Sequence, residues 1–402
     1  MTDATTRRPL DGIRVLELGQ LIAGPFAGTL LAYFGAEVIK IEPPGSGDAL
    51  RGWRVLDQGT SYWWFSQGRN KKSVTVNLRD REGQDIVRSL AATADVLVEN
   101  FKPGQMEHWG LGPEQLKAIN PALIYTRVSG YGQTGPDSGL PGFASVCEGF
   151  GGFRYLNGFP GEPPVRPNLS LGDTLAGLHA AFGVLLALVD RLRGGNGQGQ
   201  VVDVAIYESI FNMMESVLPE FSGAGLVREP SGSTLTGIVP SNTYRCGDGK
   251  LIIIGANTDS MYQRLMNLIR RPDLANDPEC AHNSGRVKAQ ARIDGAIGEW
   301  TCTLRSDEAI AALRGAGIAA GPIYSIADIA ADPHYAARGM FETVTVNDHE
   351  LTIPAMAPQL AATPGRTDWP GPRLGEHTDA VLGSTLGFDD SRMTELRSRG
   401  II

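Results

Sequence analysis

The sequence predicts an α/β fold whose main part is a doubly wound domain, followed by a smaller α+β domain. Candidate strands alternate with candidate helices over about the first 130 residues, which is typical of a parallel sheet covered on both faces. The chain has 402 residues, more than one ordinary hydrophobic core accommodates, so more than one domain is expected. Near residue 222 the alternation stops, and a hairpin signal with several helices follows.

The first domain can be followed element by element. Residues 13–18 and 37–42 are apolar runs rich in β-branched residues, and the segment 24–34 between them has helical composition. The three predict a right-handed parallel βαβ unit. Further strands are expected at 74–77, 95–99, 123–129 and 201–205, and further helices at 80–92, 113–119, 175–192 and 206–218. This order predicts a large Rossmann-like domain over residues 1–220, interrupted by a structureless stretch at 130–170.

The smaller domain is expected at residues 225–330. The segments 243–246 and 250–255 flank Gly247-Asp-Gly249, a sequence that favours a β-hairpin. Expected helices follow at 260–269, 286–301 and 306–313, then short strands at 321–326, 341–346 and 351–353, and a helix at 391–399.

Composition excludes several classes of function. The net charge of −8 argues against a nucleic-acid partner. The four cysteines lie far apart without the spacing of a metal site, so reduced thiols and no metal are expected. No apolar run long enough to span a bilayer and no secretory signal are apparent, so we expect a cytoplasmic protein without a membrane partner.

The stretch Ser170-Leu-Gly-Asp173 precedes the most apolar expected helix. Asp173 stands where a helix N-cap is expected, and capping is the usual role of aspartate at such a position. The alternative is a nucleophilic carboxylate that the helix dipole keeps ionised. The local sequence favours the cap and leaves the nucleophile open.

Other motifs also allow two interpretations. Gly130-Tyr-Gly-Gln-Thr-Gly135 matches a dinucleotide-binding pattern, but the prolines after it do not open a helix, which argues against such a site. The local sequence favours a solvated surface run for the cluster Arg69-Asn-Lys-Lys72, and the alternative is a phosphate-binding site. Asn100 and Phe101 follow a strand, at the edge where α/β sheets bind ligands. Glu148 and Arg166 flank the Asp173 segment, where Arg166 either holds a substrate carboxylate or forms a structural ion pair.

Taken together, these segments resemble the class III CoA transferases, the family of formyl-CoA transferase, carnitine CoA transferase and the α-methylacyl-CoA racemases. The resemblance covers essentially the whole chain. The matching stretches include 9–18, Ala23-Gly-Pro25, 35–42, Gly45-Ser-Gly-Asp48, Asn70-Lys-Lys-Ser73, 95–104, Ser129-Gly-Tyr-Gly132, Leu171-Gly-Asp173, 197–203, Gly321-Pro322 and Gly375-Glu-His-Thr378.

The resemblance implies that Asp173 is the nucleophile, forming first a mixed anhydride with the acyl group and then an aspartyl-CoA thioester. It implies CoA contacts from Gln20, Leu21, Ala23, Asn70, Lys71, Lys72, Asn100 and Phe101. Ser231-Gly232 lies where the family has a glycine loop over the site. The resemblance also implies an interlocked, ring-like homodimer, and a large domain that combines both termini, to which residues 331–402 return.

Departures from the family pattern narrow the range of expected substrates. Ile22 replaces a glutamine of the formyl-CoA transferases. Phe143-Ala144 replaces both their Tyr-Glu pair and the His-Asp pair of the racemases, so formate or oxalate transfer and racemisation are disfavoured. With Glu148 and Arg166, the loop is similar to members that move CoA from succinyl-CoA to dicarboxylic or hydroxy-dicarboxylic acids. An acyl-CoA racemase or epimerase and a non-catalytic CoA-binding protein remain as alternatives.

Overall fold

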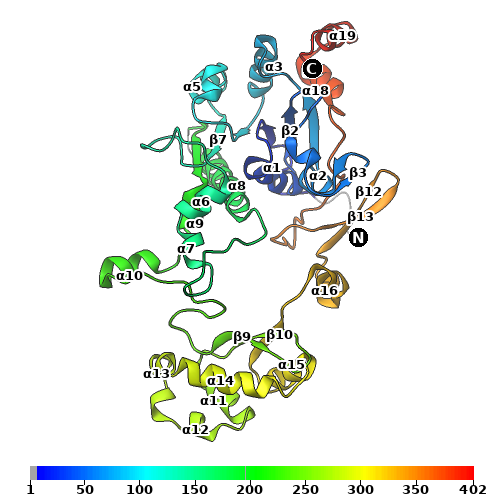
Figure 1. Ribbon diagram of the computed structural model, residues 1–402. Helices are drawn as coiled ribbons and strands as arrows, with labels where there is room; N and C mark the ends of the chain where they lie inside the picture. Colours follow the sequence, from blue (N-terminus) through cyan, green and yellow to red (C-terminus); the bar gives the residue numbers. More distant parts are fainter. Residues whose placement is uncertain (1–6, 195) are drawn as a thin grey trace. The chain divides into compact units, whose positions relative to one another are not determined.

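Six parallel strands form the central sheet of the chain (Figure 1). The computed structural model describes residues 7–194 and 196–402. The strands lie in the order β5-β2-β1-β6-β7-β8, and every neighbouring pair is parallel. Their bounds are β1 (Arg14–Glu17), β2 (Glu37–Glu42), β5 (Lys71–Thr75), β6 (Val96–Glu99), β7 (Ile124–Ser129) and β8 (Val201–Ala205). The expected α/β fold with a parallel sheet is therefore confirmed.

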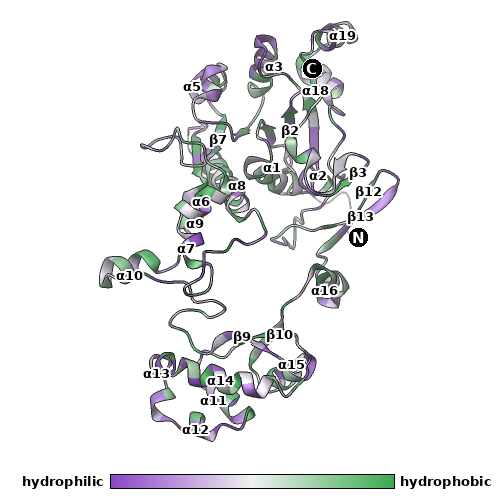
Figure 2. Cartoon of the chain, in the orientation of Figure 1, coloured by the Kyte–Doolittle hydropathy of each residue, from purple (hydrophilic) through white to green (hydrophobic). Residues whose placement is uncertain are grey.

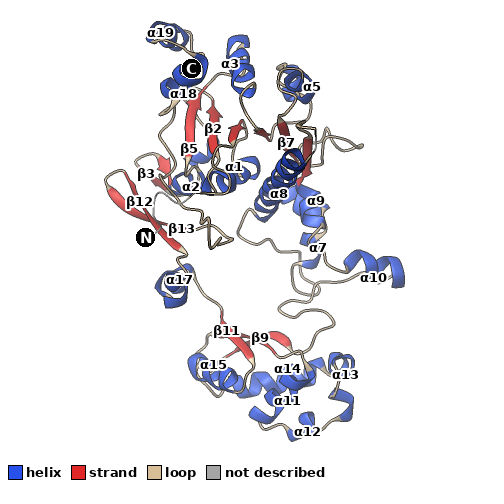
Figure 3. Cartoon of the chain, turned by 180° about the vertical axis from the view of Figure 1, so that it is seen from behind, coloured by secondary structure: helices blue, strands red, loops and turns tan. Residues whose placement is uncertain are grey.

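Helices cover both faces of this sheet (Figure 3). Successive side chains of a strand point to opposite faces, so Leu16 joins a core with α3, α18 and α19, whereas Val15 joins a core with α1 and α8. Figure 2 shows these strands in mixed colours, because polar residues interrupt the apolar runs of β2 and β5. The helix bounds are α1 (Ala23–Tyr33), α3 (Arg81–Ala91), α8 (Leu171–Arg193), α18 (Thr378–Leu386) and α19 (Asp390–Ser398).

The chain divides into two compact units. The first contains the chain up to Phe153, Pro167–Glu215 and His334–Ile402, and the second contains Arg154–Arg166 and Ser216–Pro333. The remaining elements of the first unit are η1 (Ala49–Gly52), β3 (Leu56–Asp57), β4 (Thr60–Ser61), α2 (Tyr62–Gln67), α4 (Gln105–His108), α5 (Pro113–Lys117), α6 (Ala144–Phe150), α9 (Ile206–Phe211), β12 (Phe341–Val346) and β13 (His349–Pro354).

The second unit has its own core around a three-stranded antiparallel sheet in the order β11-β10-β9. The turn at Gly249, which has a φ of +81°, joins β9 to β10, so the expected hairpin is confirmed. The larger elements of the unit are α10 (Val217–Ala224), β9 (Ser241–Arg245), β10 (Leu251–Gly255), α11 (Asp259–Leu268), α13 (Asn283–Lys288), α14 (Gln290–Thr301), α15 (Ser306–Gly315), β11 (Ala319–Pro322) and α16 (Ile326–Ala331).

Several expectations about local structure are wrong. The strand expected at 74–77 is β5, which begins at Lys71, and the helix expected at 286–301 is two helices, α13 and α14. The stretch 130–170 contains α6 and α7 (Phe153–Leu156), which are too short to show a helical period. The expected helix at 206–218 is two helices, α9 and α10, separated by a turn in which Glu215 has a positive φ of 50°.

The helix α8 differs from its predicted form in length and in burial. It begins at Leu171 instead of residue 175, and in the described chain it is the helix long and apolar enough to cross a bilayer by length and composition. The expectation that no segment reaches this length is therefore wrong. Its inner face packs on β7, β8 and α1, whereas Leu178, Phe182, Leu186 and Val189 on its outer face are exposed.

Gly177 allows α8 and α1 to approach each other closely. A Cβ atom at this position would lie 2.6 Å from the carbonyl oxygen of Ala23 and 2.9 Å from Cβ of Phe26. We expect Gly177→Ala to lower the free energy of unfolding by about 1–3 kcal/mol, because the added methyl overpacks the helix pair. Thermal or urea unfolding measures this change. Gly298→Ala in α14, where a Cβ meets nothing within 4 Å, is the control and should stabilise slightly; equal effects of the two would contradict the packing account.

Candidate active site at the carboxyl edge of the sheet

Two cavities adjoin at the carboxyl ends of the parallel strands. The smaller, of about 340 Å³, contains Asp173 in its wall, and the larger, of about 720 Å³, extends past the ends of β2 and β5. Both are lined by Gln20, which follows β1, and by Phe101, which follows β6. Because β2 lies on one side of β1 and β6 on the other, this is the point where the strand order reverses. Open α/β sheets bind their ligands at such points.

The side chain of Asn100 hydrogen-bonds to the turn that follows β1. Its Oδ1 accepts the backbone N–H of Gln20 at 2.8 Å, and its Nδ2 donates to the carbonyl oxygen of Gln20 at 2.8 Å. The side chain therefore ties the end of β6 to the end of β1 by two bonds. The turn then leads through Ile22, which is buried in the wall of the smaller cavity, into the first turn of α1.

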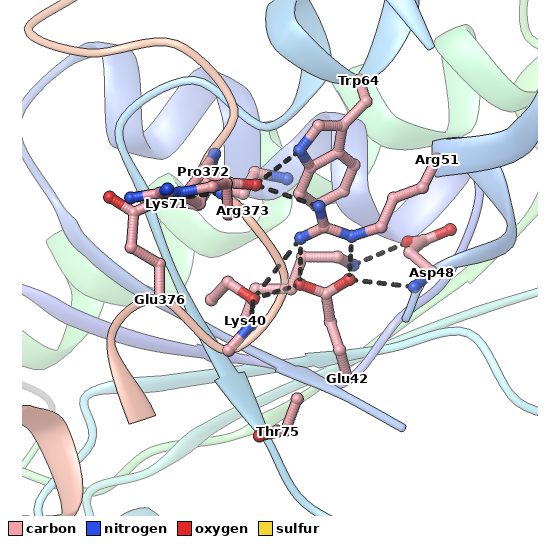
Figure 4. A network of polar contacts seen from close by, with 12 residues as sticks. Lys40, Glu42, Asp48, Arg51, Trp64, Lys71, Thr75, Pro372, Arg373 and Glu376 are labelled. Atoms are coloured by element: carbon pink, nitrogen blue, oxygen red, sulfur yellow. Dashed lines mark hydrogen bonds and ion pairs between the residues drawn. The ribbon is translucent and has the colours of Figure 1, made fainter. Parts of the chain in front are cut away.

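A buried network of charges lies beneath the same turn (Figure 4). Lys40 Nζ contacts Glu17 Oε1 at 2.9 Å, the carbonyl oxygen of Gly19 at 2.8 Å and Asp48 Oδ2 at 2.8 Å. Asp48 Oδ1 accepts the backbone N–H of Leu21 at 2.9 Å. Burial opposes the ionisation of Asp48, but the Lys40 ammonium and the backbone donors hold its pKa below the usual value. The turn is therefore supported from below by the buried pair of Lys40 and Asp48.

The outer part of this network fixes the wall of the larger cavity. Arg51 forms a two-pronged ion pair with Glu42 through Nε and Nη2, both at 2.8 Å, and its guanidinium lies 3.7 Å from the centre of the Trp64 ring. Arg51 and Trp64 also donate to the carbonyl oxygen of Pro372 (Figure 4). The C-terminal part of the chain therefore supports the segment that carries Asp48.

Asp173 occupies the third position of α8 and is not its N-cap. The N-cap is Ser170, whose side chain makes no capping bond, so the expected capping role is wrong because the helix begins two residues before Asp173. The first-turn position still places the carboxylate at the helix N-terminus, where the helix dipole favours negative charge. The side chain reaches the cavity that Gln20, Leu21, Ile22, Ala23, Asn100, Phe101 and Phe143 also line.

Glu148 and Cys147, both on α6, lie behind this helix start. Glu148 is fully buried, and its Oε1 accepts the backbone N–H of Gly172 at 3.3 Å, so it bonds an N–H group that the N-cap leaves open. Burial, with the negative charges of Asp173 and Glu148 nearby, raises the pKa of the Cys147 thiol to about 11. A thiol with this pKa is almost entirely protonated at neutral pH and is a poor nucleophile.

This pKa predicts the alkylation pattern of the native protein. At pH 8 roughly a thousandth of Cys147 is thiolate, and the side chain is buried, whereas Cys302 is exposed. We therefore expect iodoacetamide to label Cys302 within minutes and to leave Cys147 unlabelled, as peptide mass mapping would show. Labelling of Cys147 at a rate comparable with that of Cys302 would contradict this description of the site.

Three residues expected to contact CoA lie away from both cavities. Asn70 is buried, and its Oδ1 accepts the backbone N–H groups of Asp368 and Trp369. Lys71 is buried between Glu17, at 2.9 Å, and the carbonyl oxygen of Pro25. Lys72 forms an ion pair with Glu37 at 2.6 Å. Protein groups thus engage all three side chains, and the structure does not bring them together with Asp173.

The other predicted residues fall into two groups. Ile22 and Phe143 line the smaller cavity with Asp173, as do Gln20, Leu21, Ala23, Asn100 and Phe101. Arg166, Ser231 and Gly232 belong to the second unit, where Arg166 is exposed and the N–H of Gly232 donates to Gly158. Residues 130–143 contain no helix, so the expectation that the glycine motif does not open one is confirmed.

Sequence reasoning missed several residues of the cavity walls. Arg79 and Trp109 line the larger cavity, and Trp53 and Lys102 line the smaller one. The ring of Trp109 lies edge-on to Phe101 with centroids 5.1 Å apart. Arg79 follows the end of β5, and because parallel strands end at one edge, its place after a strand was a usable signal. In the part of the chain described, no three His, Cys, Asp or Glu side chains form a cluster suited to a metal.

Known proteins show the same sequence pattern and fold. The family model for CoA-transferase family III matches residues 10–378. The succinyl-CoA–D-citramalate CoA-transferase of Chloroflexus aurantiacus is 45% identical, over 100% of both chains. The human succinyl-CoA:glutarate CoA-transferase is 31% identical, over 100% of this chain and 91% of its own. A solved CaiB/BaiF family protein from Brucella suis, 33% identical, superposes with a TM-score of 0.83 over 94% of this chain and 100% of its own.

Proposed function

Because this chain belongs to CoA-transferase family III, we propose that it moves CoA from succinyl-CoA to a dicarboxylic or hydroxy-dicarboxylic acid through Asp173. The observation that carries the proposal is the position of Asp173, in the wall of a cavity at the strand-order reversal that adjoins a second, larger cavity. Relatives named as succinyl-CoA CoA-transferases for citramalate, malate and glutarate support the choice of donor and acceptor class.

The two cavities fit the two ends of an acyl-CoA. We place the nucleotide end in the larger cavity, where Arg79 supplies positive charge for a phosphate and Trp109 an aromatic surface for the base. The pantetheine arm then passes Gln20 and Phe101, which line both cavities, and brings the thioester to Asp173. In this arrangement CoA does not contact Asn70, Lys71 or Lys72, because other protein groups bond to their side chains.

The reaction proceeds in four substitutions at carbonyl carbon. Asp173 attacks the succinyl carbonyl, the C–S bond breaks, and CoA thiolate leaves, which forms a mixed anhydride. The thiolate attacks the Asp173 carbonyl, succinate leaves, and an aspartyl-CoA thioester remains. The carboxylate of the acceptor displaces the thiolate to form a second anhydride. Attack of the thiolate on the acceptor carbonyl then releases the new acyl-CoA and restores the Asp173 carboxylate.

The surroundings of Asp173 suit these steps. Each substitution develops negative charge on a carbonyl oxygen, which backbone N–H groups at the starts of α1 and α8 stabilise. Val128, Ile206 and Phe143 give the cavity an apolar wall that limits access of water to the anhydride. Cys147, which is buried behind the start of α8 and has a raised pKa, is a poor competing nucleophile.

A donor and acceptor screen tests the proposed activity. Succinyl-CoA and acetyl-CoA are each offered with succinate, glutarate, malate, citramalate and a monocarboxylic control, and new acyl-CoA is measured by mass spectrometry. We expect transfer from succinyl-CoA to at least one dicarboxylic acid and none to the monocarboxylic control. Exchange of the α-hydrogen of an acyl-CoA with deuterium, without transfer to any acid, would instead identify a racemase or epimerase.

We also propose an interlocked homodimer in the cytoplasm, without a membrane or nucleic-acid partner. The exposed apolar face of α8 supports association of two copies, and packing of its inner face on the sheet supports a core helix. The four free thiols support a reducing compartment. Light scattering of the purified protein should give twice the mass of the 42.9 kDa chain, and a monomer would refute the dimer.

A further inference from the structure

We infer that Asp48 is a positioning residue that holds Leu21 in a left-handed backbone conformation and thereby sets the shape of the CoA site. The inference rests on the proposed function, because it takes the two cavities as the place where CoA binds. Asp48 itself lines neither cavity. Its effect on the reaction is therefore exerted through the turn that it fastens.

Leu21 is the strained residue of this turn. Its φ is +64°, a value that residues with a Cβ atom rarely adopt and that glycine adopts readily. The residue lines the smaller cavity with Asp173, and the neighbouring Gln20 lines both cavities. Relaxation of Leu21 to a negative φ would turn the peptide groups of Gln20 and Ile22 away from their present positions. Contacts with the surrounding protein must therefore stabilise the left-handed conformation of Leu21.

Asp48 supplies the bond at the strained residue. Its Oδ1 accepts the backbone N–H of Leu21 at 2.9 Å and that of Leu50 at 2.9 Å, and the side chain is 1% exposed. The same carboxylate therefore joins the turn after β1 to the segment from Pro43 to Ala49, which forms a wall of the larger cavity. The buried Asp48 carboxylate thus stabilises the backbone at the place where the two cavities adjoin.

Lys40 keeps this carboxylate charged and in place. Its Nζ lies 2.8 Å from Asp48 Oδ2 (Figure 4). It also donates to the carbonyl oxygen of Gly19 at 2.8 Å, so it bonds to both the carboxylate and the start of the turn. Asn100 holds only the peptide groups of Gln20, on the other side. Asp48, by contrast, accepts the backbone N–H of Leu21 itself.

The test compares alanine and glycine at position 21 with and without the Asp48 carboxylate. Asp48→Asn is nearly isosteric, but with its oxygen toward Leu21 and Leu50 its NH2 group would face the Lys40 ammonium. This donor–donor repulsion drives the side chain out of its present position and weakens the bond to Leu21. We expect the substitution to raise the Kd for CoA, measured by calorimetry, about tenfold. With Asp48 present, Leu21→Ala and Leu21→Gly should bind CoA within threefold of each other. With Asp48→Asn, Leu21→Gly should bind at least fivefold more tightly than Leu21→Ala, because glycine takes the left-handed conformation without help.

Asp95→Asn is the matched control. Asp95 also accepts a backbone N–H, that of Arg14 at 2.9 Å, and forms an ion pair, with Arg191 at 2.7 Å, but it precedes β6 at the opposite edge of the sheet. The Asp95→Asn substitution should lower the melting temperature and leave the Kd for CoA unchanged. If Asp48→Asn is unfolded at the assay temperature, Asp48→Glu replaces it, because it keeps the charge but displaces the carboxylate. We then expect the same difference in CoA affinity between Leu21→Gly and Leu21→Ala.

The outcomes separate this inference from the proposed function. Failure of the wild-type protein to bind CoA would overturn the proposed function. Wild-type binding together with an unchanged Kd in the Asp48 variant would overturn the positioning role alone. The positioning role would also be overturned if Leu21→Ala and Leu21→Gly lost the same affinity for CoA with Asp48 present and with Asp48→Asn. A carboxylate that only stabilises the fold would affect the two variants equally.

Discussion

Replacement of Asp173 by asparagine is expected to reduce kcat for CoA transfer by about four orders of magnitude or more. The amide has nearly the shape of the carboxylate, but its nitrogen does not attack a thioester, so neither the anhydride nor the aspartyl thioester forms. The rate of succinyl transfer, measured from the new acyl-CoA, checks this prediction. The Kd for CoA should change little, because the remaining walls of both cavities are intact.

Asp190 provides the matched control for this substitution. It lies on the same helix, α8, near the other end and exposed to solvent. Asp190→Asn should retain wild-type kcat and nearly wild-type stability, because an exposed carboxylate of this kind contributes little. Transfer by Asp173→Asn within tenfold of the wild-type rate would remove Asp173 from the role of nucleophile.

Substitution of Asn100 by aspartate is expected to lower kcat/KM for succinyl-CoA about a hundredfold. The new carboxylate would still accept the N–H of Gln20, but its second oxygen would face the carbonyl oxygen of Gln20, to which Nδ2 now donates at 2.8 Å. Loss of a donor together with this repulsion in a partly buried site costs about 2–3 kcal/mol. Steady-state kinetics with a chosen acceptor acid measures the change.

Asn120→Asp separates the site effect from general destabilisation. Asn120 bridges backbone groups in the same way, since its Nδ2 donates to Ala91 and Ala94 and its Oδ1 accepts from Ala122. It lies before β7, at the opposite edge of the sheet from the cavities. We expect a similar fall in melting temperature with kcat/KM within twofold of wild type. If Asn100→Asp also keeps its kcat/KM, the turn after β1 does not position the substrate.

Much of the fold was predictable because the strands carry their own signal. The run at 37–42 became β2 with the predicted bounds, and the strands near 14, 96, 124 and 201 are found within two residues of their expected limits. Apolar, β-branched residues that are buried on both faces of a parallel sheet leave a continuous pattern in the chain. The helices α6 and α7 escaped prediction because seven and four residues are too few to show such a pattern.

The start of α8 shows how tertiary packing overrides a local signal. Asp173 looked like a cap because a polar residue followed by an apolar run is the usual form of a helix start. Gly172 instead lies inside the helix, where a Cβ atom would meet Ile206 at 3.2 Å and Ala144 at 3.3 Å. The N–H of Gly172 is bonded by Glu148, 24 positions earlier in the chain. No pattern local to residue 173 contains that partner.

The candidate site was predictable where it follows strand ends and unpredictable where distant chain covers it. Gln20 and Asn100 come directly after strands, so their meeting at one edge followed from the parallel order. The local sequence favours a solvated surface run for the cluster that contains Asn70 and Lys71, and the family resemblance implies CoA contacts, but both side chains are buried. Their side chains are engaged by Asp368 and Trp369 and by Glu17 respectively, partners that lie far away in the sequence.

The central claim is that Asp173 forms the covalent intermediate, and trapping that intermediate tests it most directly. The protein is incubated with succinyl-CoA, treated with hydroxylamine or borohydride, digested and mapped by mass spectrometry, with Asp173→Asn and protein without succinyl-CoA as controls. We predict a hydroxamate or a reduced side chain at Asp173, formed only in the presence of succinyl-CoA and absent from the variant. Active protein that carries no modification at Asp173, or carries it at another residue, would contradict the mechanism.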